Sequence, residues 1–162
     1  MGLDLYAELR RVIRALNEAG VPYAVVGAVA VSLYARPRAT QDIDLLIPED
    51  SWESVRPIMA GLGYTLLAFP MTVGAGRIRI YRVTRLEGAD LLSVDFLVPQ
   101  DPDLLWLLQD RVRATTEGID LWVIGLRGLR TLKRLRGSAQ DAADLEALGP
   151  EEGEATDGAP TG

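Results

Sequence analysis

The spacing of apolar and polar residues predicts helices interleaved with strands over the first 148 positions. Leu5, Leu9, Val12, Ile13 and Leu16 recur at helical spacing with charged residues between them. Short apolar or alternating runs bounded by Gly, Pro or Asp predict strands. The predicted strands are 23–26, 42–47, 64–68, 77–84, 91–98 and 119–124. The predicted helices are 5–16, 28–34, 52–62, 102–114, a segment carrying Leu129, Leu132 and Leu135, and 140–148. Residues 70–76, which include Gly74 and Gly76, are predicted to form a loop. We expect a single domain over residues 1–148.

Composition narrows the chemistry that this domain can perform. The chain has no cysteine and no histidine, which excludes disulfides, the usual zinc sites and a Ser-His-Asp triad. Any chemistry must use carboxylates, backbone groups, Arg, Tyr or the single lysine, Lys133. No stretch approaches the roughly 18 apolar residues of a membrane helix, and the N-terminus mixes acids with arginines, unlike a secretion signal. We therefore expect a cytoplasmic protein with no membrane partner.

Residues 149–162 differ in composition from the rest of the chain. They are rich in Gly, Pro and acidic residues and contain no large apolar side chain, so we predict a disordered tail. Their four acids account for four of the net charge of −6, and the body carries only −2. With a net charge this small, residues 1–148 lack the excess of basic residues that tight non-specific binding of nucleic acid requires.

The predicted strand 42–47 begins with two acidic residues, Asp42 and Asp44. Residues at i and i+2 of a strand point to the same face, which puts their α-carbons about 6–7 Å apart. Crowding two carboxylates raises the pKa of at least one of them unless a cation is supplied. Mg²⁺ prefers carboxylate oxygens and keeps its other positions for water and phosphate. This pair therefore indicates a magnesium site.

A glycine turn just upstream adds an anion site. The predicted strand 23–26 runs through Gly27 directly into the predicted helix 28–34, which leaves backbone N–H groups free at the helix N-terminus. Those N–H groups and the helix dipole favour phosphate. An anion site beside paired carboxylates is suited to a metal-bound triphosphate.

A third acidic residue, Asp95, interrupts the strongly apolar strand 91–98. A charge in such a run is costly unless it is paired or bound to metal, so we predict that Asp95 joins Asp42 and Asp44. The alternative is an aspartate that faces solvent or pairs with a nearby arginine. Arg77, Arg79 and Arg82 in the strand 77–84 predict one basic face, either solvated or facing phosphate or RNA.

These residues together resemble a known family. Gly27-Ala28-Val29-Ala30, the run from Arg38 through Thr40 to Asp42-Ile43-Asp44-Leu45, and the later Asp95 are similar to the small nucleotidyltransferases of the DNA polymerase β superfamily, of the compact type found in bacterial toxin–antitoxin and defence loci. The resemblance covers roughly residues 21–99, with a weaker similarity near Lys133. It implies an α/β (α+β) fold, with a nucleotidyltransferase-like mixed central sheet flanked by helices.

The resemblance also implies an activity, which is transfer of a nucleoside monophosphate from an NTP to a protein or RNA hydroxyl, with a toxin or antitoxin as a partner. The implied metal ligands and catalytic residues are Asp42, Asp44 and Asp95, which would hold two Mg²⁺ ions, or Mn²⁺. The implied nucleotide contacts are Gly27, Ala28, Arg38, Thr40 and Lys133. For Lys133, a solvated basic helix end is the alternative, and Asp141 and Asp144 are expected to be cap and surface residues.

The chain departs from the family at Ala28, where the relatives carry Gly or Ser. A methyl group there crowds the approach of a phosphate and supplies no hydroxyl contact. This leaves an alternative open: a weak or inactive nucleotidyltransferase-fold protein that binds a nucleotide or a partner.

Overall fold

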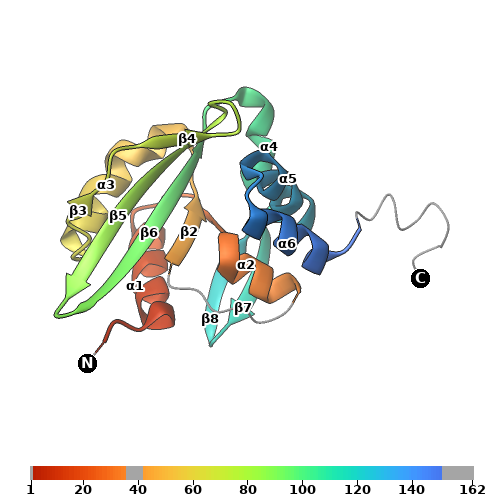
Figure 1. The fold of residues 1–162 in the computed structure, drawn as a ribbon. Helices are drawn as coiled ribbons and strands as arrows, with labels where there is room; N and C mark the ends of the chain where they lie inside the picture. The colour runs from red at the N-terminus through yellow and green to blue at the C-terminus, as the bar shows by residue number, and fades with distance from the viewer. Residues whose placement is uncertain (1, 36–41, 151–162) are drawn as a thin grey trace.

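The computed structural model describes residues 2–35 and 42–150 (Figure 1). Its helices are α1 (Leu5–Glu18), α2 (Gly27–Tyr34), α3 (Trp52–Gly61), α4 (Trp106–Gln109), α5 (Leu126–Arg136) and α6 (Ala139–Leu148), with short 3₁₀ turns at Glu49–Ser51 and Pro102–Leu104. Its strands are β1 (Ala24–Val26), β2 (Asp42–Leu46), β3 (Leu66–Leu67), β4 (Met71–Val73), β5 (Ile78–Glu87), β6 (Asp90–Pro99), β7 (Val112–Thr116) and β8 (Ile119–Val123). Within these described ranges, no helix is long and apolar enough to cross a membrane.

The strands form one mixed sheet in the order β3-β5-β6-β2-β1-β8-β7, with β4 also paired to β5. The β2–β6 and β1–β8 pairs are parallel, and the other pairs are antiparallel. The predicted mixed central sheet flanked by helices is confirmed. The parallel pairing of β2 with β6 decides the position of the acidic residues, because it lays the two strands that carry them side by side.

Helices lie on both faces of the sheet (Figure 1). On one face, α3 packs Trp52 against Tyr81 of β5, with ring centroids 4.2 Å apart, and against Phe96 of β6. On the other face lie α2, α5 and α6, which contact one another. Arg82 and Asp95, next in sequence to Tyr81 and Phe96, must point to this second face, because side chains alternate along a strand.

Buried aliphatic side chains hold the sheet together at the acidic strand. Ile43, Leu45 and Leu46 of β2 are fully buried, as is Phe96 beside them on β6. Each such side chain contributes about 1.5–3 kcal/mol relative to an exposed one. This packing fixes the register of β2, and a slip of one residue would turn Asp42 and Asp44 into the opposite face.

Three sequence-based predictions of elements are wrong. The predicted helix 102–114 ends at Gln109, and Val112–Thr116 forms β7, since it finds a partner in β8. The predicted loop 70–76 contains β4, which pairs with β5. The single basic face of 77–84 does not exist, because Arg79 and Arg82 are three residues apart and lie on opposite faces of β5.

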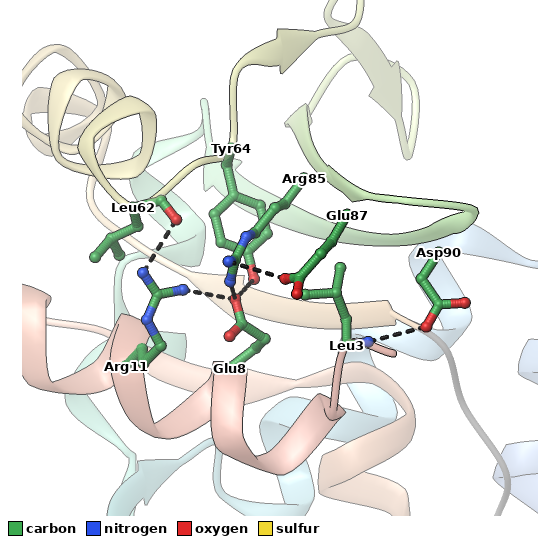
Figure 2. Close-up of polar contacts among 8 residues, drawn as sticks. All are labelled: Leu3, Glu8, Arg11, Leu62, Tyr64, Arg85, Glu87 and Asp90. Carbon is green, nitrogen blue, oxygen red and sulfur yellow. Dashed lines mark hydrogen bonds and ion pairs between the residues drawn. The ribbon is translucent and has the colours of Figure 1, made fainter. Parts of the chain in front are cut away.

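A buried glutamate, Glu8 of α1, ties that helix to the end of β5 (Figure 2). Its Oε1 accepts hydrogen bonds from Arg85 at 2.7 Å, Arg11 at 2.8 Å and the Tyr64 hydroxyl at 2.9 Å. Arg11 also donates to the carbonyl of Leu62 after α3. Burial raises the pKa of Glu8, but the hydrogen bonds from Arg85 and Tyr64 and the charge of Arg11 outweigh it, so this pKa lies below its ordinary value.

We expect Glu8→Gln to lower the free energy of unfolding at pH 7 by about 1–3 kcal/mol, since it weakens three charge-assisted hydrogen bonds. Because the pKa of Glu8 is depressed in the folded state, its stabilisation is complete above its ordinary pKa of 4.5 and is lost as the pH falls below it. The difference between the two proteins in urea unfolding should therefore narrow at acidic pH. Glu18→Gln, at the exposed end of the same helix, is the control and should have little effect.

Candidate active site

The sheet brings the three predicted carboxylates to one face. Asp42 and Asp44 are two residues apart on β2, and Asp44 lies directly opposite Asp95 in the parallel pairing with β6. Asp42 pairs with Ser93 in the same register. All three carboxylates line one pocket of about 140 Å³.

The opposite wall of this pocket comes from α2, α5 and α6. It is lined by Ala28, Lys133, Arg136, Ser138, Gln140 and Asp141, and Arg82 of β5 completes it. Three acids of the sheet therefore face two basic residues of α5, Lys133 and Arg136. A pocket with both signs of charge matches a ligand that carries a cation and an anion together, as a metal-bound phosphate does.

Gly27 forms the bend between β1 and α2 against the acidic strand. Its φ of +68° lies in the left-handed region, and a Cβ added there would overlap the carboxylate of Asp44. Glycine is therefore required at position 27 for two reasons: its backbone conformation is left-handed, and a larger residue would overlap Asp44. Val26 supplies no side-chain cap to α2, so the helix begins beside Asp44 with its first N–H groups uncapped by that residue.

We expect Gly27→Ala to lower the free energy of unfolding more than Gly20→Ala does. Gly20 has nearly the same φ, +70°, but a Cβ there meets nothing within 4 Å. The Gly20 variant should therefore lose only roughly 1–2 kcal/mol in free energy of unfolding, the cost of a left-handed conformation for alanine. The Gly27 variant should lose more, because its new Cβ also overlaps the carboxylate of Asp44. Urea unfolding measures both, and equal losses would show that the overlap costs nothing.

Asp44 has the most perturbed carboxyl group of the site. Burial raises its pKa, the charges of Asp95 and Asp42 raise it further, and Arg136 and Lys133 lower it only in part, so the pKa of Asp44 rises to about 7. Arg136 and Lys133 thus do not fully offset the effects of burial and of the two neighbouring acids on Asp44. An additional cation bound there would stabilise the charged form of Asp44.

Asp95 is held by an arginine. Arg82 Nε donates to Oδ1 at 2.7 Å and Arg82 Nη2 donates to Oδ2 at 2.9 Å, so both carboxylate oxygens are engaged. With the side chains placed in this way, no three acidic side chains in residues 2–35 and 42–150 converge closely enough to hold a metal ion. The sequence-based alternative, that Asp95 pairs with a nearby arginine, therefore describes this conformation.

Lys133 is buried rather than solvated, which excludes the alternative of a solvated helix end. Its Nζ lies 3.0 Å from Asp144 Oδ2 and 3.4 Å from Asp141 Oδ1. Asp141 also closes a capping box with Ser138 at the start of α6, as predicted for a cap. The expectation that Asp141 and Asp144 lie at the surface is wrong, because both are 2% exposed.

Sequence reasoning predicted Lys133 as a nucleotide contact, but it missed Arg82, Arg136 and Asp141 as residues of the pocket and the ion pairs of Lys133 with Asp141 and Asp144. A signal for Arg82 was present: the turn at 87–90 makes Glu87 and Asp90 a cross-strand pair, and counting back along both strands pairs Arg82 with Asp95. Two of the predicted nucleotide contacts, Arg38 and Thr40, lie outside the described residues.

Comparison with known proteins yields structural neighbours only. No protein-family model and no curated protein sequence matches this chain. The predicted nucleotidyltransferase TM1012 of Thermotoga maritima aligns over 90% of this chain and 93% of its own, with a TM-score of 0.61 and 16% identity. The lincosamide antibiotic adenylyltransferase LnuA, solved with lincomycin, aligns over 91% of this chain and 98% of its own, with a TM-score of 0.60 and 12% identity.

A third structure agrees with these two. ANT(2")-Ia, in complex with adenylyl-2"-tobramycin, aligns over 93% of this chain and 83% of its own, with a TM-score of 0.56 and 15% identity. This chain has the nucleotidyltransferase fold. Identities of 12–16% bear on the fold alone, so the function of this nucleotidyltransferase-fold protein must be argued from its pocket.

Proposed function

We propose that the chain is a magnesium-dependent nucleotidyltransferase that moves a nucleoside monophosphate from an NTP to a hydroxyl group. One observation carries the proposal: Asp42, Asp44 and Asp95, from adjacent parallel strands, line a single pocket together with two basic residues of α5. The likeness in fold to known adenylyltransferases supports it.

The donor set fits a hard divalent ion in its chemistry. Three carboxylates line the pocket, and burial together with the charges of Asp95 and Asp42 raises the pKa of Asp44. Asp42 and Asp44 would hold the ions, and Asp95 would join them once it leaves Arg82. Bound there, Mg²⁺ would neutralise the triphosphate and favour both attack by the acceptor hydroxyl and departure of pyrophosphate.

The remaining pocket residues suit the phosphates. The N-terminus of α2 at Gly27 and Ala28 offers backbone N–H groups, and Lys133 and Arg136 offer positive charge across the pocket. Lys133 arrives preorganised, because Asp141 and Asp144 fix its Nζ. Preorganised charge of this kind stabilises a transition state without reorganisation during the reaction.

The proposed reaction forms one bond and breaks one. The acceptor oxygen bonds to the α-phosphorus, the bond from that phosphorus to the bridging oxygen breaks, and pyrophosphate leaves with the bonding electrons. We assign the proton of the acceptor hydroxyl to Asp95, the third carboxylate of the pocket, which would accept it once Arg82 has left.

The acceptor is proposed from resemblance and fold. A protein hydroxyl, as in a toxin–antitoxin partner, or an RNA end follows from the resemblance in sequence. The structural neighbours add the hydroxyl of a small molecule, because LnuA was solved with lincomycin and ANT(2")-Ia with an adenylylated tobramycin.

Two observations favour the second candidate function, a binding module without turnover. Ala28 places a methyl group in the pocket, where it crowds a phosphate. Arg82 donates hydrogen bonds to both carboxylate oxygens of Asp95, which keeps them from a metal ion. A protein of this kind would bind an NTP but leave it intact.

Transfer from α-³²P-labelled NTPs tests the proposal and separates the two candidates. The protein is incubated with Mg²⁺ and each of the four NTPs, together with a bacterial lysate protein fraction, total tRNA, lincomycin or tobramycin as acceptor. We expect label on one acceptor class and matching release of pyrophosphate. Binding of an NTP with no transfer or pyrophosphate release in any combination would favour the binding module.

A further inference from the structure

The ion pair between Arg82 and Asp95 is built into the sheet. The two residues are directly opposite each other on the antiparallel strands β5 and β6, so their side chains leave the same face together. The guanidinium makes two parallel hydrogen bonds of 2.7 and 2.9 Å to the carboxylate. This two-pronged geometry is the strongest that arginine makes with a carboxylate.

The two partners differ in how much they need this contact. The Asp95 side chain is 11% exposed, whereas the Arg82 side chain is 48% exposed. A buried carboxylate needs a cation near it, but a half-exposed guanidinium is hydrated well enough to leave at modest cost. Asp95 can therefore exchange one cation for another, and Arg82 can return to solvent.

The contact also explains why the acids do not converge. Asp95 is aligned with Asp44 across β2 and β6, but both of its oxygens are directed to Arg82. Because Asp95 lies between β2 and β5, it has a carboxylate partner on one side and a guanidinium on the other. The two cations, guanidinium and metal, would compete for the same oxygens.

We propose that Arg82 competes with the metal ion for Asp95 and thereby weakens metal binding by the nucleotide-free protein. The proposal rests on the proposed function, since it assumes that a divalent ion binds at Asp42 and Asp44. In this account Arg82 is a resident counter-ion. It neutralises Asp95 while the pocket is empty, and it yields this carboxylate when metal and nucleotide arrive together.

Direct titration with Mn²⁺ in the absence of nucleotide tests this competition, with free Mn²⁺ measured by electron paramagnetic resonance. We expect Arg82→Gln to bind Mn²⁺ about tenfold more tightly than the natural chain, because it removes the two charge-assisted hydrogen bonds to Asp95 that the metal must displace. Arg82→Lys should lie between them, as it keeps the charge but loses the fork. Arg79→Gln, on the same strand but the opposite face, should bind like the natural chain.

A double variant separates competition for Asp95 from a general change of charge. In an Asp95→Asn background, Arg82→Gln should leave Mn²⁺ affinity nearly unchanged, because the carboxylate over which they compete is gone. A tightening that persists in this background would mean that Arg82 acts only through its charge, and would overturn the proposal. Thermal unfolding of each variant shows that it is folded.

The outcomes distinguish this inference from the proposed function. If the natural chain binds Mn²⁺ and Arg82→Gln binds it equally or more weakly, the competition is contradicted and the metal site stands. If neither the natural chain nor any Arg82 variant binds Mn²⁺, the metal-dependent function fails and the competition fails with it.

Discussion

Replacing Asp44 by asparagine is expected to abolish transfer and to stabilise the empty protein at the same time. Transfer should fall at least about 100-fold, the loss typical of removing one preorganised electrostatic contact to a transition state. Stability should rise because the half-buried carboxylate of Asp44, next to Asp95 and Asp42, is unfavourable when charged. A function that is maintained at a cost in stability is typical of an active site.

The gain in stability should depend on pH. Because the pKa of Asp44 is raised from 3.8 to about 7 in the folded state, ionisation destabilises the fold as the pH rises through this interval. The size of this shift limits the gain in the free energy of unfolding to about 4 kcal/mol. The full gain is expected above pH 7, and no gain is expected below pH 4. Urea unfolding at pH 5 and pH 8 in EDTA measures it, with the exposed Asp50→Asn as the control. A variant less stable than the natural chain at pH 8 would contradict this account of Asp44.

Lys133→Met is expected to be the most destabilising single change in the site. It removes the Lys133 ammonium from two acids that are each 2% exposed, Asp141 and Asp144, while Asp141 keeps its hydrogen bonds from Ser138 and the Arg136 guanidinium at 3.9 Å. Breaking a buried ion pair from one side costs about 3–5 kcal/mol. For a chain of this size, that loss lowers the melting temperature by roughly 10 °C. Differential scanning calorimetry measures it directly.

Two further variants show whether the loss arises from the uncompensated acids. Arg14→Met removes an exposed cation from α1, a helix that does not line the pocket, and should change the melting temperature little. Adding Asp144→Asn to Lys133→Met should recover part of the lost stability, because it removes one of the two buried carboxylates that have lost Lys133. If the double variant is no more stable than Lys133→Met alone, the loss comes from packing of the lysine stem instead.

The sequence predicted the acidic face of the sheet because its signals are local. Asp42 and Asp44 share a face because side chains alternate along a strand. Gly27 lies between two apolar runs, which predicts a bend at that position. The cost of a charge in an apolar strand predicted that Asp95 joins the pair, but not the parallel pairing of β2 with β6 that sets Asp95 opposite Asp44. Nothing in the 50 residues between the two acids specifies that pairing by itself.

The parts that sequence reasoning missed depend on contacts between distant elements. Lys133, Asp141 and Asp144 look like solvent-exposed charges in sequence, but the packing of α5 on α6 buries them together. Val112–Thr116 is a partial exception, because three of its five residues are β-branched and favour a strand, and its pairing with β8 fixes that conformation. The prediction of one basic face fails for a local reason, since residues three apart on a strand, such as Arg79 and Arg82, point to opposite faces.

A crystal structure with Mn²⁺ and a non-hydrolysable NTP tests the central claim most directly, since anomalous scattering locates the metal without assumptions about its ligands. The account predicts a Mn²⁺ peak between Asp42 and Asp44, with Asp95 turned from Arg82 toward the metal and the triphosphate lying between the start of α2 and Lys133. A triphosphate bound elsewhere, or Mn²⁺ held without Asp42 and Asp44, would contradict it.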